Sequence, residues 1–241
     1  MTSELLIYKQ FIVDTYLHFI KQNIILIKQL LEEGEKWNRA YNSSRKEIYF
    51  TARAIHLQIM SIIGTTAEHL IKIILLKRGY ILNEGCCDLK FNDELMEQLK
   101  KANTDELISE DEKQKLYEKG AGSIKVTFSD RLIKFNKCIE LFKKSNPPDY
   151  HSQIENYNLN DDRIKYKTDY LGYSEITPEN CLDVLQKVRN NYIHKATAHD
   201  EQNGIIWYLL NYIIWLAKKE YLDYFKDEEY IGNDKSKKLF K

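Results

Sequence analysis

Glycine and proline are scarce in this chain, which has 9 glycines and 3 prolines among 241 residues. Sandwiches and barrels need many tight turns, and these two residue types mark most of them. Their scarcity argues against a turn-rich all-β fold and favours long helices. Hydrophobic residues make up 43% and charged residues 30%, so a packed globular core is expected.

Zinc-binding cysteine pairs, a net charge and a long apolar run are also missing. None of Cys86, Cys87, Cys138 and Cys181 forms a C-x-x-C pair, which predicts reduced thiols and argues against a zinc or redox site. The 36 basic and 36 acidic residues cancel, which argues against a DNA-coating protein. The N-terminus lacks a basic stretch followed by an apolar run, so we expect no signal peptide. The apolar stretch 204–217 is shorter than the roughly 20 residues of a membrane span, so we expect a cytoplasmic protein without membrane contact.

Apolar residues recur at helical spacing through most of the chain. The pattern predicts helices over 3–33 with a stop at Gly34, over about 46–78 with a stop at Gly79, over about 92–101 and 104–119, and from Ser129 or Asp130 to Lys143. Thr177 and Pro178 mark the start of a further helix that reaches Arg189. The last helix, over roughly 200–226 with a cap at Thr197 or Asp200, is apolar almost all round and must be buried on more than one side.

These elements predict an all-α protein with long helices. We expect one domain over residues 1–241, with its core at about 3–79 and 127–230, short helices at about 80–126 and a long loop or insertion at 145–176 before the motif helix. The loop is rich in tyrosine. Its aromatic rings could stack on bases, or they could anchor the loop to its own domain, which is the commoner role.

The segment most informative about chemistry is Arg189-Asn190-Asn191-Tyr192-Ile193-His194. It joins a permanent cation to the side chain that titrates near neutral pH. In RNA cleavage a base removes the proton of a 2′-hydroxyl, which attacks phosphorus, and an acid protonates the leaving oxygen. His194 suits that proton transfer, and the planar fork of Arg189 suits the charge on the phosphorus. The nucleophile belongs to the substrate, so we expect no metal and no cofactor.

The spacing of the pair needs a structural explanation. Side chains five positions apart on a continuous helix lie roughly 140° apart, so they would not share a face. The helix could therefore end or kink between Arg189 and His194, or the two groups could meet across a cleft that a second subunit completes. Asn190 could orient a phosphate or brace the backbone. On spacing alone, an arginine and a histidine near a helix end are also ordinary structural features.

The pattern Arg189-Asn190-x-x-x-His194 resembles the R-x4–6-H signature of HEPN-domain proteins, in its R-N-x-x-x-H form. The stretch from Thr65 to Gly79 also resembles an early helix of that family, in which an acidic residue, here Glu68, precedes a leucine-rich run. The resemblance implies an antiparallel helical bundle that dimerises and places two motifs at one composite cleft. It implies metal-independent ribonuclease activity, often in toxin–antitoxin or antiphage systems, with an antitoxin or defence protein as partner.

One feature of the family pattern is absent. Some family toxins carry a tyrosine two residues after the histidine, where a partner nucleotidyltransferase modifies it, but here that position is Ala196. Regulation by that route is therefore not expected.

Other polar residues have plainer interpretations beside functional ones. Glu68 could bond Arg189, although most helical glutamates face solvent, and we expect it to do so too. Lys165, Lys167 and Lys195 are candidates for contacts with RNA, against the default of solvated lysines. His69 and His199 have weaker functional cases, and no H-E-x-x-H metal motif occurs.

Two other functional classes compete with the nuclease. One is a non-catalytic helical module of the same fold that only binds RNA or a protein. The presence of both Arg189 and His194 favours the enzyme, because a binding scaffold need not keep the pair. The other is a ligand sensor with 145–176 as its lid, which the lack of a glycine-rich phosphate loop disfavours.

Overall fold

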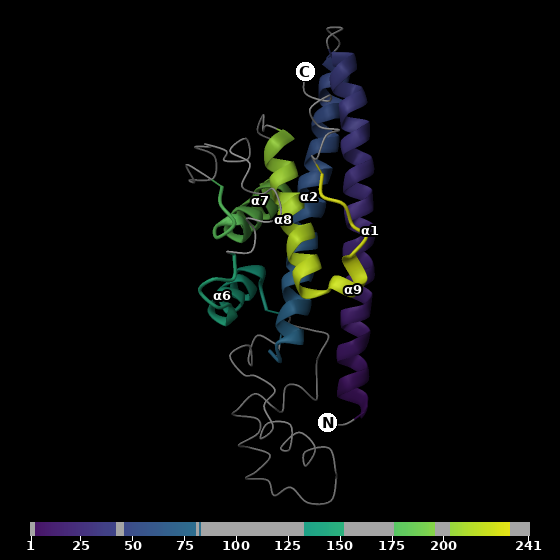
Figure 1. Cartoon of the computed structure of the whole chain (residues 1–241). Coiled ribbons are helices and arrows are strands. Elements are labelled where there is room, and N and C mark those ends of the chain that lie inside the picture. The colour runs from purple at the N-terminus through teal and green to yellow at the C-terminus, as the bar shows by residue number, and fades with distance from the viewer. Residues whose placement is uncertain are drawn as a thin grey trace, which may run out of the picture. The chain divides into compact units, whose positions relative to one another are not determined.

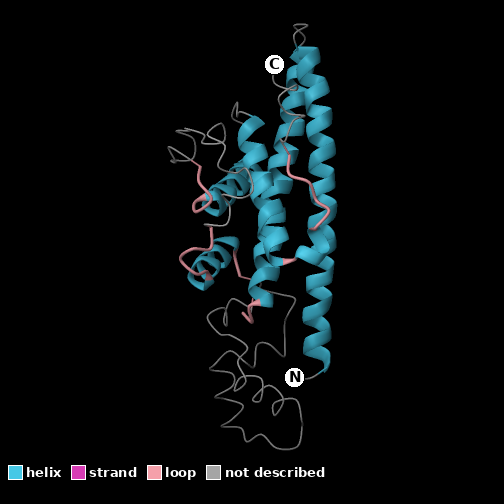
Figure 2. Cartoon of the chain, in the orientation of Figure 1, coloured by secondary structure: helices cyan, strands magenta, loops and turns pink. Residues whose placement is uncertain are grey.

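A computed structural model describes residues 3–41, 46–80, 82, 133–151, 176–195 and 203–231 of the chain. Helices dominate this part, and no strand occurs within it (Figure 2). The helices are α1 (Ser3–Tyr41), α2 (Lys46–Lys77), α6 (Phe135–Ser145), α7 (Cys181–Lys195), α8 (Asn203–Glu220) and α9 (Leu222–Phe225), labelled in Figure 1. The predicted all-α fold class is confirmed. The short helices predicted within 80–126 and most of the 145–176 segment lie outside the described residues.

The contacts divide the chain into two compact units. Unit 1 combines Met1–Leu17 with Ile71–Asn146, and unit 2 combines His18–Leu70 with Pro147–Lys241. Both α1 and α2 therefore contribute residues to each unit. A single domain over the whole chain stays a prediction.

Within unit 2, α1 and α2 form an antiparallel pair. Asn23 Nδ2 donates to Thr66 Oγ1 at 3.0 Å near one end of the contact. At the other end Gly34 faces Ile55, so later residues of α1 meet earlier residues of α2. Apolar side chains at helical spacing fill the space between them; those of α1 are Ile20, Ile24 and Ile27, all fully buried.

The predicted stop of the first helix at Gly34 is wrong, because α1 continues to Tyr41. A lone glycine costs a helix only about 1 kcal/mol relative to alanine and does not end it by itself. Contacts across this turn support the helix: Glu33 accepts bonds from Lys36 Nζ at 2.9 Å and Trp37 Nε1 at 3.0 Å. A Cβ at Gly34 would lie 3.5 Å from Ile55 Cγ2, an ordinary contact.

The predicted stop of the second helix at Gly79 is confirmed. The N–H of Tyr80 donates to the carbonyl of Leu75 at 2.9 Å, and the N–H of Gly79 donates to that of Leu76 at 3.0 Å. This pair of bonds is the Schellman motif, which needs a left-handed residue, and Gly79 has φ 86°. Glycine adopts that conformation without steric cost.

Within the described residues, one long apolar segment lies in α2. Residues Arg53–Lys77 are long and apolar enough to cross a membrane by length and composition, with a mean hydropathy of 1.6 over the window. However, 78% of this apolar stretch is buried within the fold, and a buried core helix can be equally long and apolar without crossing a membrane.

In unit 1, α6 begins later than predicted. The expected caps Ser129 and Asp130 lie outside the described residues, but Ile133 and Lys134 are extended and the helix starts at Phe135. The N–H of Ile133 donates to the carbonyl of Leu82 at 2.8 Å, so this donor is satisfied outside a helix.

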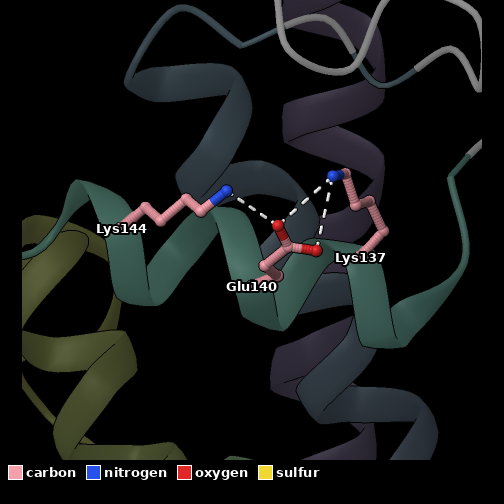
Figure 3. A network of polar contacts seen from close by, with 3 residues as sticks. All are labelled: Lys137, Glu140 and Lys144. Carbon is pink, nitrogen blue, oxygen red and sulfur yellow. Dashed lines mark hydrogen bonds and ion pairs between the residues drawn. The ribbon is translucent and has the colours of Figure 1, made fainter.

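The surface of α6 carries a charged network, which Figure 3 shows. Glu140 lies between Lys144, whose Nζ is 2.8 Å from Oε1, and Lys137, whose Nζ is 3.3 Å from Oε2. Hydrogen bonds from Lys144 and then Lys137 lower the pKa of Glu140. Exposed pairs three and four residues apart are ordinary on a helix surface and stabilise little. We therefore assign no functional site here.

The helix predicted over 200–226 is two helices. α8 ends at Glu220, Tyr221 departs from helical geometry with φ −138° and ψ 55°, and α9 follows. The break allows Phe225 to be fully buried and the following chain to reach Lys28, which pairs with Glu228 at 3.0 Å. The predicted caps Thr197 and Asp200 lie outside the described residues.

The predicted burial of the last helix on more than one side is confirmed. Every residue of α8 from Tyr208 to Ala217 is buried. The one amide among them, Asn211, binds the backbone of Ile231, donating to its carbonyl at 2.6 Å and accepting from its N–H at 2.7 Å. Both polar ends of this side chain are thus satisfied, as burial requires.

Candidate functional site

The motif helix α7 starts three residues after Pro178, its predicted first residue. Thr177 and Pro178 form a turn, and regular helix begins at Cys181. Asn180 joins the turn to the helix: its Oδ1 accepts the N–H of Thr177 at 2.8 Å, and its carbonyl accepts the N–H of Val184 at 3.0 Å. The predicted position of the helix is confirmed, with its boundary shifted because the first turn is not α-helical.

α7 runs without interruption through the whole motif, to Lys195. The expectation that the helix ends between Arg189 and His194 is therefore wrong, and a kink between them stays a prediction. On this helix the two positions lie roughly 140° apart around the axis. The side chains of residues 191–195, including those of His194 and Lys195, lie outside the described part of the structure. Completion of the site by a second subunit stays a prediction.

Gly64 of α2 lies directly against Arg189 of α7, both in unit 2. A Cβ at Gly64 would lie 2.6 Å from Arg189 Cβ and 3.2 Å from both its Cα and its Cγ. Real Cβ atoms almost never come closer than 3.0 Å to another heavy atom. The absence of a side chain at position 64 thus allows α7 to approach α2, and the contact fixes the stem of Arg189.

One turn further along α2, Glu68 pairs with the same arginine. Arg189 Nη2 lies 2.7 Å from Glu68 Oε2, and the side chains are 26% and 11% exposed. Of the two alternatives for Glu68, the favoured one, exposure to solvent, is wrong, and the other, pairing with Arg189, is confirmed, because α7 covers this face of α2. A carboxylate with so little water is retained only if a cation or hydrogen bonds compensate its charge.

The guanidinium of Arg189 keeps donors that Glu68 does not use. The contact with Glu68 involves one terminal nitrogen, whereas arginine carries five N–H donors. Its Nε is buried and has no hydrogen-bond partner among the described residues. An anion with several oxygens, such as a phosphate, matches this arrangement of donors.

The remaining predicted site residues are placed only in part. Asn190 follows Arg189 on α7 and is half-buried. His194 and Lys195 belong to the same helix by their backbone. The proposed RNA contacts Lys165 and Lys167, and His199, lie outside the described residues. The structure thus brings Arg189 and Glu68 together and says nothing of the other contacts.

Sequence reasoning missed Gly64. A signal was present, since Gly64 stands alone inside the apolar run from Ile59 to Leu76, where glycine weakens a helix. A glycine kept in such a place commonly marks the close approach of another backbone. Which helix approaches cannot be read from α2 by itself.

Tyr150, at the start of the tyrosine-rich segment, anchors this part of the chain to α8. Its hydroxyl bonds Glu220 Oε1 at 2.8 Å, its carbonyl accepts Lys219 Nζ at 2.6 Å, and its ring packs edge-on against Trp215. Only 5% of the residue is exposed, so it is not available to stack on a base. The anchoring role is confirmed for Tyr150, and the later tyrosines lie outside the described residues.

The described cysteines offer no reactive group. Cys138 and Cys181 are free and buried, and burial raises the pKa of the Cys181 thiol. A thiol that resists ionisation is a poor nucleophile and metal ligand. No cluster of three potential metal ligands occurs among residues of the described ranges.

His56 of α2 gives the protein a predicted pH dependence. Burial lowers the pKa of His56 below its usual 6.5, and its buried Nε2 has no hydrogen-bond partner within the described ranges. The folded state therefore favours the neutral ring, whereas the unfolded chain gains a proton near pH 6.5. Stability should thus be complete above that pH and should fall as the pH drops below it.

We expect urea to unfold the wild-type protein at a lower concentration at pH 5 than at pH 7.5. His56→Gln, which cannot take up the proton, should show a smaller difference between the two. An equal difference in both proteins would show that other groups cause the pH dependence.

No protein-family model, curated protein or solved structure matches the chain.

Proposed function

We propose that the chain is a metal-independent endoribonuclease in which Arg189 and His194 act on the scissile phosphate. The observation that carries the proposal is the placement of Arg189. Gly64 packs against the stem of Arg189, and Glu68 pairs with Nη2 of its guanidinium. The other N–H groups of the guanidinium can donate hydrogen bonds to phosphate oxygens. The same helix carries His194 in the R-N-x-x-x-H pattern.

The proposed reaction uses the 2′-hydroxyl of the substrate as nucleophile. A base removes its proton, the oxygen forms a bond to the adjacent phosphorus, and the bond to the 5′ oxygen breaks. An acid protonates that leaving oxygen, and His194 supplies one of the two proton transfers. Arg189 stabilises the negative charge that builds up on the phosphorane oxygens. Asn190 can orient the phosphate.

A second copy of the chain completes the proposed site. Because α7 is continuous, the positions of Arg189 and His194 lie roughly 140° apart around the axis of the helix. A homodimer with the two motif helices at a shared cleft places the arginine of one chain beside the histidine of the other. The HEPN resemblance implies the same composite arrangement.

The biological setting follows from the resemblance. We propose a cytoplasmic toxin or antiphage effector, held in check by an antitoxin or another defence protein. Lys165, Lys167 and Lys195 are proposed to contact the RNA backbone. Such contacts would add affinity without selecting a base sequence.

The experiment that tests the proposal is incubation of purified protein with total RNA in the presence of EDTA, beside a His194→Ala variant. Fragmentation by the wild-type protein alone supports the proposal. Intact RNA in both samples would contradict it for the protein acting by itself.

The ion pair itself favours a second candidate, a non-catalytic helical module. Glu68 neutralises Arg189, and a purely structural role, the attachment of α7 to α2, is sufficient to explain a buried pair of this kind. In that case the wild-type protein would bind RNA or a protein without cleaving it.

A further inference from the structure

We propose that Glu68 is an internal competitor of the substrate: its carboxylate pairs with Arg189 in the free protein and weakens the binding of phosphate to the same guanidinium. This inference rests on the proposed function, because it concerns the same arginine. It assigns Glu68 to the control of anion binding and not to the reaction itself.

The first argument is that Glu68 is not needed to position the arginine stem. Gly64 already holds Cα, Cβ and Cγ of Arg189 by direct packing. Glu68 meets the side chain at its far end, where the closest nitrogen is Nη2.

The second argument concerns charge. A phosphate that binds the two terminal nitrogens of Arg189 shares Nη2 with Glu68, which brings two anions within a few ångströms of each other. Glu68 is 8% exposed, so little water screens that repulsion. Phosphate binding therefore loses affinity through the presence of Glu68.

The third argument is that a neutral isostere preserves the packing. Glutamine has nearly the shape of glutamate, and its amide oxygen can still accept the bond from Nη2. Glu68→Gln thus removes the charge and keeps the contact. If Glu68 competes with phosphate, this variant binds the anion more tightly; if Glu68 instead orients Arg189 electrostatically, it binds more weakly.

The test measures binding of a short RNA with 2′-O-methyl groups throughout, which cannot be cleaved by 2′-hydroxyl attack, by titration calorimetry. Glu68→Gln should lower the dissociation constant about tenfold, an effect of the size expected for removing one nearby like charge. In assays with cleavable RNA, KM should fall while kcat changes little. Glu68→Asp keeps the negative charge, so it should show no such gain in affinity. Comparison of the two variants separates the effect of the charge from the effect of a substitution at this position.

The chain offers a matched control in Glu228. It is also buried and paired to a cation, with Lys28 Nζ at 3.0 Å from its Oε2, but it contacts α1 and not α7. Glu228→Gln should leave RNA affinity unchanged. Unchanged or weaker binding by Glu68→Gln, with Arg189→Ala still abolishing binding, overturns the competition and leaves the proposed function standing. Wild-type affinity in Arg189→Ala removes the anion site and the proposed function with it.

Discussion

Replacing His194 with alanine is expected to reduce RNA cleavage by about 10²–10⁴-fold, the usual contribution of a general acid or base. Arg189→Ala should cost on the order of 10²–10³-fold, because the charge of the transition state loses its clamp. Arg189→Lys should also lose most activity, since an ammonium cannot grip two oxygens in a planar fork. The measurement is the initial rate on a labelled RNA in EDTA.

Arg189→Ala should also lower the stability of the protein. It removes the cation that lies 2.7 Å from the buried Glu68 carboxylate, and breaking a buried pair in this way costs about 3–5 kcal/mol. The double variant Arg189→Ala/Glu68→Gln removes both charges, so it should regain much of the melting temperature and stay inactive. That combination separates chemistry from folding, which the single variant cannot do.

Controls for this comparison come from the other histidines. His69→Ala and His199→Ala should retain most activity, because neither belongs to the motif. If the double variant recovers both stability and cleavage, Arg189 is structural and the assigned role is wrong. If His194→Ala cleaves RNA at the wild-type rate, the motif has no part in the reaction.

Gly64→Ala is expected to damage both the fold and the site. The new Cβ would lie 2.6 Å from Arg189 Cβ and 3.2 Å from its backbone Cα, so α7 itself must move. Overpacking of this kind costs about 1–3 kcal/mol. A displacement of about 1 Å in a catalytic group can lower a rate about 10²-fold, so cleavage should fall steeply even where the protein stays folded.

Gly34→Ala is the matched control for that substitution. Gly34 also lies inside a long helix, but a Cβ there meets Ile55 Cγ2 at an ordinary 3.5 Å. Alanine should raise the unfolding free energy by about 0.5–1 kcal/mol through its better helix propensity. Denaturant titration of both variants checks the contrast. Equal effects at the two glycines would show that α7 does not pack against α2 as described.

The sequence was sufficient for features that depend on residues close together in the chain. Helical periodicity predicted α1, α2 and the all-round burial of α8, and Gly79 predicted the end of α2. These features follow from local dihedral preferences and from the apolar pattern of one helix. Gly34 was misread because the contacts of Glu33 outweigh a modest glycine penalty.

The features missed in the site depend on residues far apart in the sequence. Glu68 was expected in solvent because nothing in α2 shows that α7 will cover it. Gly64 gained its meaning only from Arg189, which lies 125 positions later. The direction of the approach between two helices is set by packing, and one helix alone does not carry that information. The motif itself could be recognised in the sequence because Arg189 and His194 are only five positions apart.

The central claim is that the 2′-hydroxyl of RNA is the nucleophile and that no metal takes part. It is tested most directly with a short RNA of defined sequence, first mapped for its cleavage site and then made again with a single 2′-O-methyl group at that site. The unmodified and the methylated RNA are each incubated with the protein in EDTA, and the masses of the products are measured by mass spectrometry. The account predicts fragments with a 2′,3′-cyclic phosphate and a 5′-hydroxyl from the unmodified RNA, and no cleavage at the methylated position. Equal cleavage of the methylated RNA, or cleavage that EDTA abolishes, would contradict it.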